Sequence, residues 1–77
     1  MSHTELDCRR LLCPMPVIRV QDQIAQLQPG DELHAICTDP GVLQDIPAWC
    51  RINGHLVLDQ RVEDDEYIIH IRVQEEA

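Results

Sequence analysis

Cysteine is the residue type in this sequence that offers the most reactive side chain. The 77-residue chain contains Cys8, Cys13, Cys37 and Cys50. No two of them form the C-x-x-C pair that is typical of zinc ribbons and thioredoxin-like redox sites. Cys13 differs from the others because it opens the segment Cys13-Pro14-Met15-Pro16. Prolines fix the backbone angle φ, so Pro14 and Pro16 predict a rigid segment that presents the Cys13 thiol outward.

The position of Cys13 also predicts how its sulfur is stabilised. A helix is expected to begin just after it, and a thiolate at a helix N-terminus is favoured by the positive end of the helix dipole. This effect alone would lower the pKa of the thiol by no more than about one. Pro14 and Pro16 have no N–H group, so we expect the N–H of Met15 or Val17 to donate to the sulfur.

The charge distribution singles out the same segment. The chain has 6 Arg, no Lys and 14 acidic residues, for a net charge of −8. Residues 8–21 nevertheless contain Arg9, Arg10 and Arg19 without any acidic residue. Such a basic island favours a thiolate or an anionic sulfur species and attracts acidic partners. The alternative is that the three arginines form an ordinary solvated surface.

Composition excludes several classes of function. A chain without lysine cannot form a Schiff base or use a P-loop lysine, and a pI near 4.6 argues against direct binding to nucleic acid or anionic membranes. The N-terminal residues lack a basic segment followed by an apolar run, so we expect no signal peptide, reduced thiols and a cytoplasmic location. The length allows one domain, residues 1–77.

Hydrophobic periodicity predicts six elements. Strands are expected at residues 5–8, 32–38, 55–62 and 67–73, and helices at about residues 17–27 and from Pro40 to Asn53. This order predicts an α/β (α+β) two-layer sandwich, β-α-β-α-β-β, with a mixed four-stranded sheet and both helices on one face. The uncovered face is then expected to carry His34, Ile36, Ile68, His70 and Arg72.

Several residues have a structural as well as a functional interpretation. Asp39 and Asp45 each precede a helix-start signal and are predicted to be N-caps, with Pro47 kinking or restarting the helix. Cys8 and Cys37 alternate with apolar residues and are expected in the core. Cys50 lies on an inward stripe, which indicates burial, although it could also serve as a second thiol. His55 follows a helix C-terminus and is interpreted as a partner of its dipole, and Trp49 fits either the core or a docking face.

Histidines and cysteines were also considered as metal ligands. His34 and His70 could share the open sheet face, but two imidazoles without a third ligand are weak support for a metal site. We therefore predict no metal site and no cofactor.

Motifs along nearly the whole chain resemble one known family. Leu11-x-Cys13-Pro14-Met15-Pro16, Thr38-Asp39-Pro40, Asp45-Ile46-Pro47-x-x-Cys50 and Gly54-His55 together resemble the TusA/SirA family of small sulfur carriers. The resemblance implies the same two-layer fold, and it implies that Cys13 carries sulfur as a persulfide between proteins. The family pattern has a small glycine where this chain has Arg10, a departure that concerns partner choice rather than the reactivity of Cys13.

The family resemblance also implies partners. The donor would be a cysteine desulfurase or a rhodanese, and the acceptor a Tus/Dsr-type relay or a heterodisulfide-reductase-like complex. These acceptors serve tRNA thiolation, molybdenum cofactor supply or dissimilatory sulfur oxidation. The chain would then be a sulfurtransferase-like carrier rather than a turnover enzyme. Two alternatives remain open: a non-catalytic interaction or regulatory module that docks through the Cys13 loop, and a redox protein that pairs Cys13 with Cys50.

Overall fold

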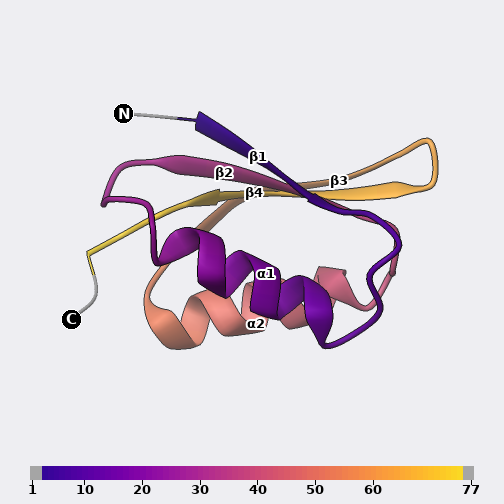
Figure 1. Cartoon of the computed structure of the whole chain (residues 1–77). Coiled ribbons are helices and arrows are strands. Elements are labelled where there is room, and N and C mark those ends of the chain that lie inside the picture. Colours follow the sequence, from indigo (N-terminus) through magenta and orange to yellow (C-terminus); the bar gives the residue numbers. More distant parts are fainter. Residues whose placement is uncertain (1–2, 76–77) are drawn as a thin grey trace.

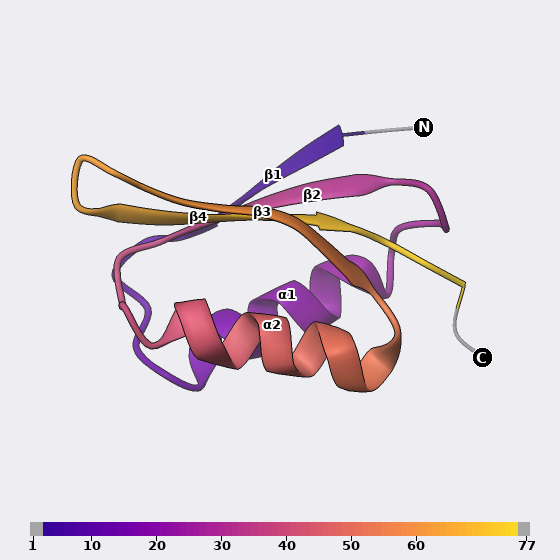
Figure 2. The same ribbon diagram turned by 180° about the vertical axis from the view of Figure 1, so that it is seen from behind.

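The computed structural model describes residues 3–75. Its elements follow the predicted order: β1 (His3–Cys8), α1 (Met15–Ile24), β2 (Glu32–Cys37), α2 (Val42–Asn53), β3 (Leu56–Glu63) and β4 (Glu66–Arg72). The four strands of the described chain form one mixed sheet, and both helices cover the same face of it (Figures 1 and 2). The predicted α+β sandwich is therefore confirmed.

The order of the strands in the sheet is β1-β2-β4-β3. β1 and β2 are parallel, whereas β4 runs antiparallel to both β2 and β3. In the final hairpin, β4 therefore lies inside the sheet and β3 lies at its edge. This arrangement fits the side chains of the two strands, because Ile69 and Ile71 of β4 are fully buried while no residue of β3 is. The tight turn between them places Asp64 and Asp65 at positive φ, as two-residue hairpins require.

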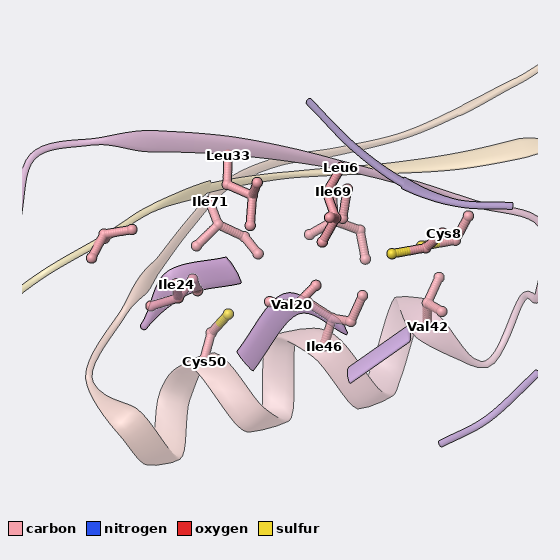
Figure 3. Close-up of a cluster of buried hydrophobic side chains, with 13 residues drawn as sticks. Leu6, Cys8, Val20, Ile24, Leu33, Val42, Ile46, Cys50, Ile69 and Ile71 are labelled. Carbon is pink, nitrogen blue, oxygen red and sulfur yellow. The ribbon is translucent and has the colours of Figure 1, made fainter. Parts of the chain in front are cut away.

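The core lies between the sheet and the two helices. Figure 3 shows side chains from all of these layers meeting there, with Val20 and Ile24 from α1, Ile46 and Cys50 from α2, and Ile69 from β4 among them. The predicted burial of Cys8, Cys37 and Cys50 is confirmed, since all three are fully inaccessible to solvent. Three of the four thiols thus serve as small apolar side chains of the core.

Two details of the helices differ from the sequence-based expectation. Leu27 was expected within the first helix, but α1 ends at Ile24, and Leu27 follows in a turn from which it still packs against the core. α2 continues through Pro47 without a restart. Because Val42, Ile46 and Cys50 are buried on both sides of Pro47, packing holds the helix together although proline donates no hydrogen bond. Within residues 3–75, neither helix is long and apolar enough to cross a membrane.

Candidate functional site

Cys13 lies on the loop between β1 and α1, immediately before the first turn of the helix. Its side chain is exposed, and all four cysteines of the chain are free. Pro14 occupies the N-cap position of α1, and Pro16 follows in the first turn with its side chain buried. A proline at this point costs the helix no hydrogen bond, because the first N–H groups have no partner within the helix. The predicted location of Cys13 at an exposed helix start is confirmed.

The hydrogen-bond partner of the Cys13 sulfur is a carboxylate rather than a backbone amide. The Cys13 thiol donates to Asp45 Oδ2, with 3.1 Å between sulfur and oxygen. The backbone N–H of Cys13 donates to Asp39 Oδ2 at 3.1 Å. The expectation that the N–H of Met15 or Val17 donates to the sulfur is wrong for Met15, whose N–H donates to the carbonyl oxygen of Leu12 at 2.9 Å.

This carboxylate surrounding reverses the expected direction of the Cys13 pKa. The hydrogen bond to Asp45 raises the pKa of the thiol, and partial desolvation and the negative charges of Asp45 and Asp39 act in the same direction. The thiol form is therefore favoured in the resting protein. A lowered pKa, expected from the helix dipole and the basic island, is not what the structure gives.

Two arginines of the basic island contact acidic or carbonyl groups that lie outside residues 8–21. Arg9 pairs with Glu66 at 2.6 Å and with Asp7 at 3.5 Å. Arg19 donates to the backbone oxygen of Asp7 at 3.2 Å. The charges that act on the Cys13 sulfur are instead those of two carboxylates. The proposed support of the thiolate by Arg9 and Arg19 is therefore corrected: the segment is acid-free along the sequence but not in space.

Arg10 has a different role, which lies in its backbone. It adopts a φ of 66°, and its N–H donates to Thr38 Oγ1 at 2.8 Å. Positive φ is a conformation that glycine adopts without steric cost, which gives a physical reason for the glycine expected at this position from the family pattern. The hydrogen bond to Thr38 ties the Cys13 loop to the loop that precedes α2.

The two aspartates next to Cys13 come from the junction between β2 and α2. Asp39 Oδ1 accepts the N–H of Gly41 at 3.0 Å just before α2 begins, and this bond, with the one from Cys13, lowers the pKa of Asp39. The predicted N-cap role of Asp39 is nevertheless wrong, because Gly41 occupies the N-cap position of α2 and no side chain caps this helix; Asp39 instead stabilises the turn that leads into it. Asp45 is not the predicted N-cap: it lies inside α2, in its first turn, and faces Cys13.

Parallel strand topology explains why Asp45 meets Cys13. β1 and β2 run in the same direction, and each is followed by a helix, so both helices begin at the same end of the sheet (Figures 1 and 2). Asp45 is not identified as a site residue from the sequence. The usable signal is an acidic residue in the first turn of a helix, read together with the parallel topology that brings the two helix starts together.

The other residues considered for function lie in the packed layers. Cys50 is fully buried, and this burial raises the pKa of its thiol to about 11. It points from α2 into the core (Figure 3). His55 is buried, accepts the N–H of Gln74 at 3.1 Å and stacks on Trp49 with 5.5 Å between ring centroids. These contacts hold the C-terminal end of α2 against Gln74, which follows β4.

Exposed apolar side chains flank Cys13 on the loop and the first turns of α1. Leu12, Met15 and Ile18 are 73%, 44% and 41% exposed. We refer to these three residues as the apolar rim. Burying such side chains against a partner would be favourable, so the surface beside the thiol is suited to contact another protein.

Comparisons with known proteins agree on one family. The family model described as "Sulfurtransferase TusA" matches residues 4–73. The chain is 39% identical to the sulfur carrier protein TusA of Pseudomonas paraeruginosa, with 87% of this chain and 85% of the relative covered. It is 38% identical to the sulfur carrier protein TusA of Pseudomonas fluorescens, with 94% and 95% covered. The crystal structure of a SirA-like protein from Desulfitobacterium hafniense superimposes with a TM-score of 0.83 at 20% identity, covering 94% of this chain and 99% of that one, and supports the fold.

Proposed function

The chain belongs to the TusA/SirA family of sulfur carrier proteins, and from this premise we propose that it accepts a sulfane sulfur as a persulfide on Cys13 and relays it to an acceptor protein. The observation that carries the assignment to Cys13 is exposure. All four cysteines lie in the described part of the chain, and of these only Cys13 is accessible to solvent. Sulfur transfer between two proteins requires direct contact between sulfur atoms, which the three buried thiols do not permit.

The transfer is a substitution at sulfur that needs no metal and no external oxidant. The Cys13 thiolate attacks the outer sulfur of a donor persulfide, forming a new S–S bond to Cys13. The S–S bond within the donor breaks, and the donor leaves as a thiolate. An acceptor thiolate then attacks the outer sulfur of the Cys13 persulfide and restores the Cys13 thiolate. One sulfane sulfur moves in each step, and the number of S–S bonds is unchanged.

Asp45 controls the proton in this scheme. The thiol donates to Asp45 Oδ2 in the resting state, so this carboxylate is the first acceptor available when Cys13 loses its proton. The same carboxylate keeps the resting sulfur protonated, because it raises the pKa of the thiol. A donor that brings a positive charge toward Asp45 and Asp39 would weaken this effect and favour the thiolate. The reactive form would then appear mainly in the complex with a partner.

The apolar rim provides the contact surface for these partners. Leu12 adjoins Cys13, and Met15 opens the helix that follows it, so both would lie at the interface whenever a partner reaches the sulfur. Pro14 and Pro16 would keep this surface rigid, which reduces the entropy lost on docking. We propose a cysteine desulfurase or a rhodanese as the donor. The acceptor would be a Tus/Dsr-type relay or a heterodisulfide-reductase-like complex in the cytoplasm, serving tRNA thiolation, molybdenum cofactor supply or sulfur oxidation.

Sulfur loading tests the proposal directly. The protein is incubated with a persulfide, polysulfide or thiosulfate donor, and its intact mass is measured under non-reducing conditions. We expect the addition of one sulfur atom, removed by a thiol reductant, in the unmodified chain and in Cys50→Ala. Cys13→Ser should take up none. Alkylation followed by peptide mapping should locate the added sulfur on the peptide that contains Cys13.

Two results would contradict the proposal. Loading that persists in Cys13→Ser would place the sulfur on another thiol. Absence of loading from all three donors, with alkylation of Cys13 at the rate of an ordinary thiol, would favour a non-catalytic interaction module that docks through the Cys13 loop.

A further inference from the structure

Three of the four histidines gather on the sheet face that the helices leave open. His3 lies on β1, His34 on β2 and His70 on β4. His34 and His70 are directly paired across the antiparallel strands, and Glu5 is the partner of His34 on β1, so His3 lies one pleat away on the same face. The predicted positions of His34 and His70 on this face are confirmed, and His3 adds a third imidazole. This cluster and the Cys13 loop belong to different parts of the fold (Figure 1).

The three imidazoles are in mutual contact. His3 Nε2 and His34 Nδ1 share a short hydrogen bond, and their ring centroids are 4.3 Å apart. The rings of His34 and His70 are stacked, with centroids 4.0 Å apart and an interplanar angle of 15°. One ring nitrogen from each of the three residues lies within 4.8 Å of the other two.

These separations suit a transition-metal ion. A tetrahedral Zn²⁺ site has Zn–N distances of about 2.0–2.1 Å, which places its ligand nitrogens about 3.4 Å apart. The three nitrogens, which now lie within 4.8 Å of one another, would reach this spacing by side-chain rotation around the bound ion. A metal ion would also replace the proton that His3 and His34 now share. Imidazole suits Zn²⁺ and its neighbours Co²⁺, Ni²⁺ and Cu²⁺ better than Mg²⁺ or Ca²⁺.

A carboxylate already orients one of these imidazoles as in established metal sites. His70 Nε2 and Glu32 Oε1 are 2.5 Å apart, and Glu32 Oε2 accepts from Arg72 at 3.4 Å. Ligating histidines typically donate one ring N–H to a carboxylate, which fixes the tautomer and leaves the other nitrogen free for the metal. In His70, an N–H on Nε2 places the lone pair on Nδ1. Glu32 would thus be an orienting residue and the imidazole a ligand.

The surroundings leave room for a fourth ligand. A hollow of about 280 Å³ beside the cluster is lined by His3, His34, Glu5 and Arg61, among others. A water molecule or the carboxylate of Glu5 could complete the coordination from this hollow.

We propose that His3, His34 and His70 bind one divalent transition-metal ion on the open sheet face. The site is completed within one chain and is independent of the persulfide chemistry proposed for Cys13. The three imidazoles leave one coordination position for water, for the carboxylate of Glu5 or for an external ligand.

Zn²⁺ alone is the probe for this proposal, and the full-length chain with Cys13→Ser is the reference, because this removes the exposed thiol as a competing ligand. Isothermal titration should give saturable binding with one Zn²⁺ per chain. His34→Gln in the same background should weaken binding by at least about tenfold, since loss of even an orienting residue has about that effect. His55→Gln is the matched control, and it should bind as the reference does, with folding verified by circular dichroism.

A second measurement does not depend on any histidine variant. In NMR spectra of the reference protein, Zn²⁺ should shift the ring signals of His3, His34 and His70 and leave those of His55 in place. Co²⁺ bound in place of Zn²⁺ should give the visible absorption of a tetrahedral site. Absence of saturable binding, binding that survives His34→Gln, or a stoichiometry of one metal per two chains would each overturn the proposal.

Discussion

Cys13 and Cys50 carry the same thiol at two ends of the helical layer, in opposite surroundings. Cys13 is exposed on a loop and donates to the carboxylate of Asp45. Cys50 is buried in α2 and points into the core between the helices and the sheet. The pKa of each thiol is raised, in Cys13 first by the hydrogen bond to Asp45 and in Cys50 by burial. An elevated pKa therefore does not distinguish a reactive thiol from a structural one in this protein.

The two thiols differ in whether the interaction that raises the pKa can be removed without unfolding the protein. The Asp45 carboxylate beside Cys13 is only partly buried, so a charge brought close to it by a partner would change the protonation of the sulfur. Burial of Cys50 is held by the whole core, and only unfolding or a large local opening removes it. Cys13 can thus be switched at the surface, while Cys50 responds only to the stability of the fold.

Alkylation rates give the largest expected difference between the two thiols. Native protein treated with iodoacetamide should react at Cys13, whereas Cys50 should react at least about 10³-fold more slowly, because it is exposed only in the rare open state of a fold stabilised by at least about 5 kcal/mol. Mass spectrometry of peptides after timed quenching measures both rates in one sample.

Denaturation is the control for this comparison. In concentrated urea the two rates should converge to within a few fold, since both thiols are then solvated. If Cys50 reacted in native protein as fast as Cys13, α2 would open locally, and the structural interpretation of Cys50 would fail.

The sequence predicts the fold well because the features that determine it are local or periodic. The apolar stripe of Val20 and Ile24 indicates a helix, and the alternation of Leu33 with Ala35 indicates a strand. The loop residues before Gly30 and at Asp39 mark where helices end and begin. The position of Cys13 follows in the same way from the prolines beside it. Pro47 is the exception, because packing against the core overrides its tendency to break a helix.

The electrostatics of the site could not be predicted in the same way, since they depend on contacts between distant segments. Asp45 is 32 residues from Cys13 along the chain, and Glu66 is 57 from Arg9. Counting charges within residues 8–21 therefore missed the carboxylates that these contacts supply. His3 was overlooked as a neighbour of His34 for a related reason: the strand was expected to begin only at Glu5, which leaves His3 outside the sheet.

The pH dependence of the free energy of unfolding tests whether burial raises the pKa of Cys50. In the native protein the pKa of Cys50 is raised to about 11 from its ordinary value of 9.0, so between these values the unfolded chain loses its proton first. Stability is then fully present below about pH 9 and falls as the pH rises toward 11, by about 2 kcal/mol at pH 11 for this one group. Urea unfolding at about pH 8 and pH 11 measures the loss, which Cys50→Ala should reduce by that amount.

A neighbour on the same stripe of α2 provides the control for this measurement. Ile46→Val also removes buried volume, at a cost of about 0.5–1.5 kcal/mol, but it removes no ionisable group. It should therefore lower stability equally at both pH values. An unchanged pH dependence in Cys50→Ala would show that burial of this thiol does not oppose its ionisation.

Replacing Asp45 tests the interpretation of Cys13, with a smaller expected effect than the two preceding experiments. Asp45→Asn removes the carboxylate whose hydrogen bond and negative charge raise the Cys13 pKa, so the thiolate fraction and the alkylation rate near neutral pH should rise several-fold. The pH at which the rate is half-maximal should fall. Asp22→Asn, an exposed aspartate of α1, is the matched control and should leave both unchanged.

Arg19→Gln separates the structural account of the same site from the one based on charge along the sequence. If the basic island stabilised the thiolate, removing Arg19 would slow alkylation and raise the half-maximal pH. Because Arg19 donates to the backbone oxygen of Asp7, and the charges acting on the sulfur are those of Asp45 and Asp39, we expect a much smaller change than in Asp45→Asn. A slower rate in Arg19→Gln together with an unchanged rate in Asp45→Asn would return control of the thiol to the arginines. A faster rate in Asp45→Asn with little change in Arg19→Gln would show that the contact between the start of α1 and the first turn of α2 sets the protonation of Cys13.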